Sequence, residues 1–255
     1  MEKYKYDWKS IIAGLVVLLI GILMILLDMV YLHTAENLWI SIGCSLIASA
    51  IVILFTAIFV ERKRFNPLDE WGITRIFATR AEKNSDSDPQ LEKTHYCVDA
   101  VAFGLKAFRS KQTKRIEQCL KRGVNIRILT MQPNSPFVKQ RALEENETED
   151  QIAHTIEDLV KWANQLNSQN YKGKIVIKGY NCMTLDFYWR LDDTLYIGPY
   201  CYGIPSQQTI TYKFVAGGKG FSTYTDYFED LWNDNNLSAP LTEVTEFAAR
   251  KRIRK

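Results

Sequence analysis

Hydrophobic and polar residues divide this chain into two unlike parts. Ile11 to Leu27 is an apolar run of 17 residues that extends to Tyr31 across Asp28, and Leu38 to Val60 is a second run of 23 residues. A helix rises about 1.5 Å per residue, so each run is long enough to cross a hydrocarbon core of about 30 Å. The pattern predicts a transmembrane helical hairpin within residues 1–64, with spans at about 11–31 and 38–60. The lipid bilayer is then a partner through residues 11–60.

Basic residues lie on the outer flanks of both predicted spans. Lys3, Lys5 and Lys9 precede the first span and residues 62–64 follow the second, whereas residues 28–37 contain neither Lys nor Arg. Basic flanks remain in the cytoplasm. We therefore expect an integral protein of the cell inner membrane with both termini cytoplasmic. A cleaved signal peptide is the alternative for the first run, but no small-residue cleavage pattern follows it.

Small residues recur at helical spacing within the two spans. Ser41, Ser45 and Ser49 are four residues apart in the second span, and Gly14 and Gly21 are seven apart in the first. Small residues let helix backbones approach closely. Two interpretations remain open, namely packing of the hairpin against itself and assembly of two chains into a homodimer. Asp28 is costly in lipid, and we expect it to reach interfacial water near the end of its helix.

The remaining sequence alternates between strand and helix patterns. Residues 65–71 form a linker, residues 72–236 a cytoplasmic domain and residues 237–255 a basic tail. Lys83 to Pro89 is predicted to be a polar break between elements. The domain combines strands that are joined through helices with a hairpin around Asp192. This order predicts an α/β fold, an α/β/α sandwich with a mixed sheet. The expected strands are residues 72–79, 98–103, 124–130, 174–178, 185–189, 195–197 and 209–214, and the expected helices are residues 111–122, 138–166 and 223–232.

The balance of charges argues against a nucleic-acid-binding protein. The net charge is +3, and five of the last six residues, Arg250 to Lys255, are basic, so the predicted domain is close to neutral. A nucleic-acid-binding domain normally carries a basic face, and we predict no specific nucleic-acid partner. The basic tail suits either the anionic inner leaflet or a solvated end.

Common cofactor and metal motifs are missing from the sequence. The five cysteines form no CxxC pair, and the three histidines form no HExxH or other zinc-binding spacing. Neither GxGxxG nor GxxxxGK[ST] occurs. We therefore predict no cofactor and no metal site.

Three segments resemble the phospholipase D-like superfamily. Residues 112–130, "QTKRIEQCLKRGVNIRILT", resemble its passage from helix to strand before the active site. Residues 184–200, "TLDFYWRLDDTLYIGPY", resemble its motif-bearing hairpin, and "YTDYFEDLWN" resembles its closing helix. The resemblance covers roughly residues 72–236 and implies the superfamily's fold. Likeness of fold is an analogy for function and not proof of it.

The chain departs from this superfamily at the catalytic motif. Catalytic members carry HxKxxxxD, in which His attacks phosphorus, Lys neutralises phosphoryl oxygens and Asp orients the His. Anchoring the motif on Gly198 puts Thr184 and Asp186 at the His and Lys positions, and anchoring it on Asp192 puts Leu185 and Phe187 there. Neither pair replaces the originals, so we assign no catalytic residue. Catalytic members also bring two motifs together, which for a chain with one copy implies a dimer.

The first functional hypothesis is a membrane-anchored binding module that recognises a small anion, such as a nucleotide, and signals through its hairpin. Ligands of open α/β sheets lie beyond the carboxyl ends of the strands. Arginine and lysine there suit phosphate, and tyrosine suits a base. The predicted ligand-binding residues are Arg80, Ser135, Lys139, Arg141, Thr184, Asp186, Tyr188 and Tyr200.

Two further hypotheses remain open. The chain is alternatively a membrane-associated phosphodiesterase or phosphatidyl transferase with a rearranged site, in which Asp186 and Asp192 act as acids or metal ligands. The third is a membrane scaffold that binds another protein through an aromatic-rich run, made of Tyr196, Tyr200, Tyr202 and Tyr212.

Overall fold

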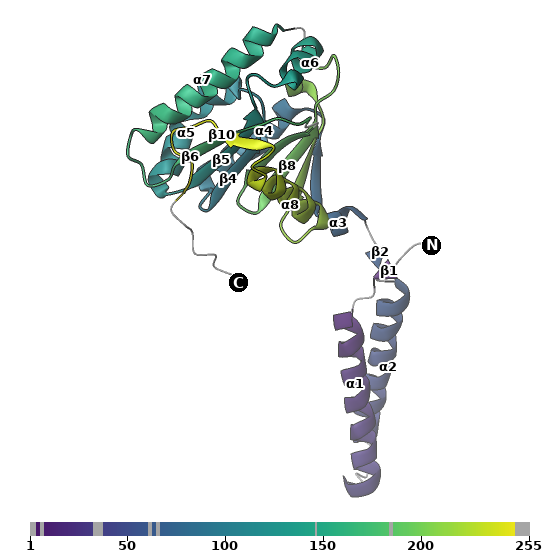
Figure 1. The fold of residues 1–255 in the computed structure, drawn as a ribbon. Helices are drawn as coiled ribbons and strands as arrows, with labels where there is room; N and C mark the ends of the chain where they lie inside the picture. The colour runs from purple at the N-terminus through teal and green to yellow at the C-terminus, as the bar shows by residue number, and fades with distance from the viewer. Residues whose placement is uncertain are drawn as a thin grey trace. The chain divides into compact units, whose positions relative to one another are not determined.

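A computed structural model describes the chain as two compact units. They comprise Met1–Pro67 and Leu68–Lys255 (Figure 1). The described residues are 4–5, 8–32, 38–60, 63–64, 67–145, 147–183 and 186–247. The predicted ligand-binding residue Thr184 and the basic residues from Arg250 onward lie outside them.

The first unit is a pair of long apolar helices, in agreement with the sequence. Both are long and apolar enough to cross a membrane, over Trp8–Val30 and Leu38–Phe59. Asp28 is only 2% exposed, whereas the sequence led us to expect contact with water. The elements are β1 (Tyr4–Lys5), α1 (Trp8–Leu27), the π-helix η1 (Asp28–Leu32), α2 (Leu38–Phe55), the π-helix η2 (Thr56–Val60) and β2 (Lys63–Arg64), which pairs with β1.

Glycines bring the two helices into close contact. A Cβ atom added to Gly21 would lie 2.9 Å from the Gly43 carbonyl oxygen, so only glycine permits this approach. Gly14 packs in the same way against Leu54. The serines instead lie on an exposed surface of α2, where Ser45 and Ser49 each donate a hydrogen bond to the carbonyl four residues earlier. The glycines therefore serve packing within the hairpin.

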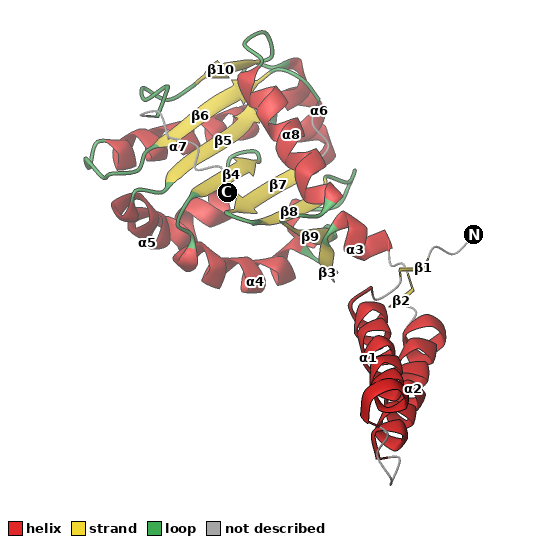
Figure 2. Cartoon of the chain, turned by 90° about the horizontal axis from the view of Figure 1, so that it is seen from below, coloured by secondary structure: helices red, strands yellow, loops and turns green. Residues whose placement is uncertain are grey.

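The second unit is built on one mixed sheet of eight strands in the order β10-β6-β5-β4-β7-β8-β9-β3 (Figure 2). Strands β4, β5 and β6 are parallel, and the other neighbours are antiparallel. The strands are β3 (Ile73–Phe77), β4 (Cys97–Val101), β5 (Asn125–Met131), β6 (Ile175–Tyr180), β7 (Asp186–Leu191), β8 (Thr194–Pro199), β9 (Thr211–Val215) and β10 (Ser238–Pro240). The helices are α3 (Pro67–Trp71), α4 (Arg80–Lys93), α5 (Lys106–Arg122), α6 (Pro136–Glu145), α7 (Glu149–Asn167), the 3-10 helix η3 (Ser206–Gln208) and α8 (Lys219–Asn233).

Alternating side chains bury both faces of this sheet. Phe187 and Trp189 of β7 join one cluster with Leu91 of α4 and apolar residues of α5 and α7. Tyr188, between them in sequence, joins the opposite cluster with Phe228 of α8. This period of two is the geometry of a strand covered on both faces. Figure 2 shows α8 across one face of the sheet, with α4 and α5 on the far side, and the predicted α/β/α sandwich with a mixed sheet is confirmed.

Several expected boundaries differ from the structure, including the start of α5, which is Lys106 and not residue 111. The polar break at residues 83–89 lies inside α4, and the helix expected over residues 138–166 is two helices, α6 and α7. Thr148 begins α7 with a capping box to Gln151. The sheet also continues past Asn236, where we expected a tail to begin, because β10 pairs with β6.

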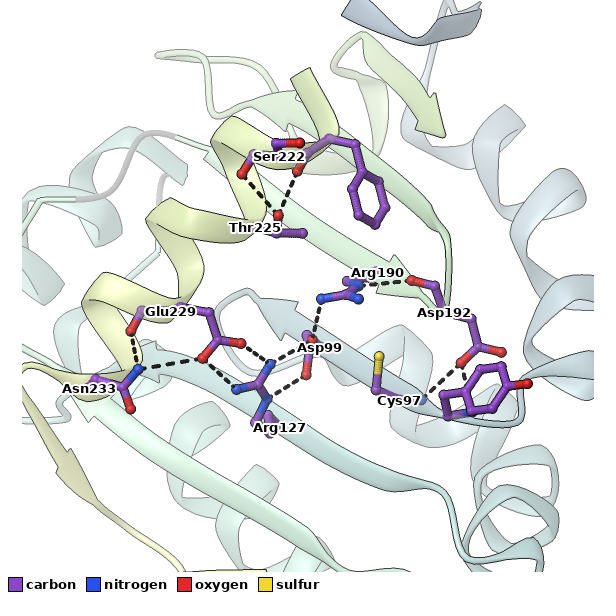
Figure 3. Close-up of polar contacts among 11 residues, drawn as sticks. Cys97, Asp99, Arg127, Arg190, Asp192, Ser222, Thr225, Glu229 and Asn233 are labelled. Carbon is purple, nitrogen blue, oxygen red and sulfur yellow. Dashed lines mark hydrogen bonds and ion pairs between the residues drawn. The ribbon is translucent and has the colours of Figure 1, made fainter. Parts of the chain in front are cut away.

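Charged side chains tie α8 to the middle of the sheet, and Asp99 among them is fully buried (Figure 3). Arg127 of β5 donates two hydrogen bonds to Asp99 of β4, at 2.7 and 2.9 Å, and two to Glu229 of α8, at 3.0 and 2.6 Å. Arg190 of β7 lies 3.6 Å from Asp99. Burial alone would lower the pKa of Arg127, but its bonds to both carboxylates outweigh burial and raise it. This network fixes the face of the sheet that α8 covers.

Candidate functional site

Strand directions bring five strand ends to one edge of the sheet. β3, β4, β5, β6 and β8 all point toward it, and we call it the carboxyl edge. Two short connections place arginines beside it. Thr79 caps α4 through the Glu82 amide, so Arg80 lies in the first turn after β3. Pro136 begins α6 after β5, and Arg141 follows on that helix.

Arg80 and Arg141 converge on the ring of Tyr200, which follows β8. Their guanidinium carbons lie 4.9 and 4.6 Å from the centre of that ring. Arg80 also lies 4.2 Å from the Phe187 ring centre, and Arg141 lies 5.1 Å from that of Phe103. The arginines are only 4% and 3% exposed. We call these five residues the arginine–aromatic cluster, and it holds two buried cations on aromatic faces.

Neighbouring polar groups orient both guanidinium groups. Arg80 Nη2 donates to Thr209 Oγ1 at 3.1 Å, and Arg141 Nη1 donates to Glu144 Oε2 at 2.9 Å. Thr211, at the start of β9, is fully buried, and its hydroxyl has no hydrogen-bond partner among the described residues. The carboxyl edge therefore combines oriented cations with a buried hydroxyl group.

Lys83 is a third buried cation, which the sequence did not single out. Its Nζ atom lies 5.1, 5.7 and 5.4 Å from the ring centres of Phe187, Trp189 and Tyr196. Burial and, to a smaller extent, the charge of Arg80 lower the pKa of Lys83, Asp88 and Asp86 raise it, and the net pKa is about 7. The spacing of Arg80 and Lys83 by three residues would place both on one helix face, but the sequence led us to expect a polar break beginning at Lys83.

The other predicted ligand-binding residues divide into separate groups. Ser135 Oγ donates to Asn181 Oδ1 at 2.8 Å and accepts from the Phe137 amide, so it shapes the turn before α6. Lys139 is exposed on α6. Tyr188 stacks on Phe228 of α8, with ring centres 5.0 Å apart, on the opposite face of the sheet from Phe187.

The two aspartates considered as acids have different surroundings. Asp192 accepts hydrogen bonds from the amides of His95, Tyr96 and Cys97, at 2.8 to 2.9 Å. Both its oxygens thus hold the start of β4, remote from the carboxyl edge. Asp186 lies at that edge, and burial raises its pKa. Among the described residues, no group of three or more His, Cys, Asp and Glu could hold a metal ion.

The tyrosines considered as a protein-binding run do not form one surface. Tyr196 is fully buried, and its hydroxyl donates to Asp86 at 2.6 Å. Tyr200 belongs to the arginine–aromatic cluster, Tyr212 is partly buried and Tyr202 is 83% exposed. Tyr200 and Tyr202 lie after β8, outside the strands, and the four side chains differ in burial.

Comparison with known proteins gives likeness of structure alone. No protein-family description and no curated protein matches the sequence. Similar solved structures include TrmBL2, an archaeal chromatin protein, with 13% identity and a TM-score of 0.40, over 77% of this chain and 64% of that one. NucT from Helicobacter pylori has 11% identity and a TM-score of 0.36, over 61% of this chain and 92% of that one. Phosphatidylserine synthase from Haemophilus influenzae has 8% identity and a TM-score of 0.47, over 78% of this chain and 47% of that one. The chain thus spans less than two thirds of the length of the first and third of these proteins.

Proposed function

We propose that this chain is a membrane-anchored, catalytically inactive phospholipase D-like protein that binds a small anion at the arginine–aromatic cluster. The convergence of Arg80 and Arg141 on Tyr200 carries this proposal. Placing two cations in a buried site costs free energy, which Glu144 offsets in part at Arg141 and which an anion between the two arginines would offset further. A guanidinium group also matches phosphate with two parallel hydrogen bonds. A nucleotide is a candidate anion because its phosphate groups suit the two guanidinium groups.

The side chains at the motif positions favour binding over catalysis. Phe187 occupies one of the two places where the superfamily's Lys is expected, and Arg80 packs on its ring. Asp186 occupies the other, and a carboxylate repels phosphate. Asp192 already accepts three backbone hydrogen bonds. Cations supplied by α4 and α6 would thus take the place of those that the hairpin lacks.

Ligand entry requires the segment beside η3 to move. Thr209 bonds to Arg80, and Gln207 Oε1 accepts from Asn84 Nδ2 at 3.4 Å. Because Arg80 is 4% exposed, an anion reaches it only after these contacts open. We infer that ligand binding changes the position of residues 201–209, and that this change is the event transmitted toward the membrane hairpin.

Calorimetry of the full chain in lipid nanodiscs tests the proposal. The probes are inorganic phosphate, pyrophosphate and a panel of linear and cyclic nucleotides. We expect at least one anion to bind, and we expect Arg80→Lys and Arg141→Lys to weaken it about tenfold each, since lysine keeps the charge but loses the planar fork. Arg115→Lys is the matched control, because Arg115 lies on the exposed side of α5 and pairs with Glu92.

Two results would contradict this function. One is the absence of heat from every probe with a folded protein, verified by circular dichroism. The other is equal affinity in the wild type and in the Arg80→Lys and Arg141→Lys variants. Hydrolysis of phospholipid or nucleic acid by the purified protein would instead support the enzyme hypothesis.

A further inference from the structure

A surface cavity of about 400 Å³ that is open to solvent lies between α5 and α7, apart from the arginine–aromatic cluster. We call it the α5–α7 cavity, and its size is within the range of small-molecule sites. No residue of the cluster lines it. The cavity is lined by side chains of both helices, including Lys106, Arg109 and Ser110 of α5 and His154, Asp158 and Trp162 of α7.

The base of the cavity is rigidly built. A Cβ atom added to Gly104 would lie 1.8 Å from a Thr155 methyl carbon, so glycine alone lets the β4–α5 connection touch α7. Arg109 then joins the two segments, because its Nε donates to the Gly104 carbonyl at 3.0 Å and its Nη2 to the Thr155 carbonyl at 3.4 Å. The cavity therefore lies between helices whose spacing is fixed.

Trp162 gives the cavity a fixed aromatic wall. Its Nε1 donates to Thr113 Oγ1 at 3.2 Å, and that hydroxyl donates to the Arg109 carbonyl at 2.5 Å. A half-buried indole held by its polar edge offers its ring to a planar group without losing further rotamer freedom.

The charged groups favour an anion with polar substituents. His154 Nδ1 lies 2.6 Å from the Asp150 carbonyl, which can only accept, so Nδ1 donates. Nε2 is therefore the nitrogen that accepts from a ligand hydroxyl or, in the protonated ring, donates to an oxyanion. Arg109 lies 3.8 Å from Asp158, which balances its charge, and Lys106 adds a further positive charge.

We propose that the α5–α7 cavity binds a small organic anion made of a planar ring and a phosphate or carboxylate group. The ring packs on Trp162, the oxyanion meets Lys106, and His154 bonds to a polar substituent. This site is independent of the function proposed for the arginine–aromatic cluster, with which it shares no side chain.

Fluorine NMR of the full chain in nanodiscs tests this site. The six tryptophans are replaced by fluorotryptophan, and the Trp162→Phe variant assigns the resonance of Trp162. The probes are adenosine 5′-monophosphate for phosphate and 4-hydroxybenzoate for carboxylate, with adenosine and inorganic phosphate as half-ligands. We expect at least one ring-bearing anion to shift the Trp162 resonance at millimolar concentration, and each half-ligand to bind about tenfold more weakly or less.

Variants separate this site from the first. Lys106→Ala should weaken the ring-bearing anion about tenfold, since a charge-assisted hydrogen bond is lost, whereas Lys111→Ala, an exposed lysine on the same helix, should leave affinity unchanged. Arg80→Lys should leave the Trp162 shift unchanged, whatever it does at the arginine–aromatic cluster. An unmoved Trp162 resonance with both ring-bearing anions, or equal affinities in the two lysine variants, would overturn the proposal.

Discussion

The amino group of Lys83 lies among aromatic core residues. Its protonation therefore affects the free energy of unfolding. Its pKa falls from 10.5 to about 7 in the folded chain. Between these two values the unfolded chain binds one more proton than the folded chain, so stability rises with pH. Below about pH 7 both states are protonated, and the cost of the buried charge is fully present. Protonated Lys83 thus lowers the stability of the folded chain at and below about pH 7.

We expect Lys83→Met to remove this pH dependence. In the wild type, the free energy of unfolding should rise by at most about 1.4 kcal/mol per pH unit above pH 7. The variant should show a flatter profile and greater stability at pH 6. Chemical denaturation of the full chain in detergent micelles between pH 6 and pH 9 measures both profiles. Lys93→Met, an exposed lysine of the same helix, is the control, and parallel profiles for Lys83→Met and the wild type would contradict the assignment.

Asp99 is the central charge of the network beneath α8. It is fully buried and accepts two hydrogen bonds from Arg127. Asp99→Asn keeps the shape but removes the negative charge that faces Arg127 and Arg190. We expect a loss of about 3 kcal/mol in the free energy of unfolding, because the two guanidinium groups lose their common partner.

The exposed Glu92–Arg115 pair provides the comparison for Asp99. Glu92→Gln removes a surface ion pair, and surface pairs contribute little to stability. Urea denaturation should therefore leave the midpoint of Glu92→Gln close to that of the wild type. If the urea midpoint of Asp99→Asn is also close to that of the wild type, the network does not contribute to stability.

The side chains of the candidate site were predictable only in part. Arg80, Arg141 and Tyr200 were expected at the ends of strands, and the structure brings them together. Asp186 and Tyr188 share one face of β7 because strand side chains alternate, and Tyr188 lies beneath α8. The sequence shows the alternation but not which face the arginines approach, since that depends on connections from distant helices.

At the scale of elements, α4 shows why polar composition misled the prediction. Its sequence contains Pro89 and, among its buried residues, Leu91 is the only apolar one, so no hydrophobic stripe indicates a helix. A usable signal was nevertheless present. Thr79 followed by Glu82 matches the spacing of a capping box, and the Glu82 amide does donate to Thr79 Oγ1 at 3.1 Å. Most strands were predicted correctly because their apolar patterns are short and bounded by Gly or polar turns.

The segment after Asn236 is part of the domain, and a truncation tests its contribution. The Ile177 amide donates to Thr242 Oγ1 at 3.1 Å, and the Leu241 amide donates to the Ile177 carbonyl at 2.8 Å. A chain that ends after Asn236 loses these bonds and leaves β6 as an open sheet edge. We expect it to aggregate or to resist protease poorly.

A chain that ends after Phe247 is the matched control for this truncation. It keeps β10 and the packing of Val244 and Phe247 on the core. Limited proteolysis and thermal unfolding of both chains in detergent measure the difference. Equal melting temperatures would mean that the β10 segment contributes nothing to the stability of the sheet.

At the scale of the molecule, the charge pattern predicts the orientation of the hairpin. The sequence located both long helices because about 50 residues contain only three Asp, Glu, Lys, Arg or His residues. We expect green fluorescent protein to fluoresce when fused to either terminus, and alkaline phosphatase to be inactive at both. Glu36→Cys in a Cys44→Ser background should react with a membrane-impermeant maleimide from outside the cell. Phosphatase activity at either terminus would contradict this orientation.

The position of β3 has a consequence for how the protein is made. Among the described strands, β3 pairs with β9 alone. Thr74 Oγ1 donates a hydrogen bond to the carbonyl of Lys213, which lies 139 residues later in the chain. At a translation rate of about 5–20 residues per second, this partner arrives roughly 7 to 28 s after β3 leaves the ribosome. By then the preceding apolar helices have also left the ribosome. A nascent chain interrupted before β9 therefore leaves β3 without its partner strand, and quality-control proteases can recognise such an unpaired strand.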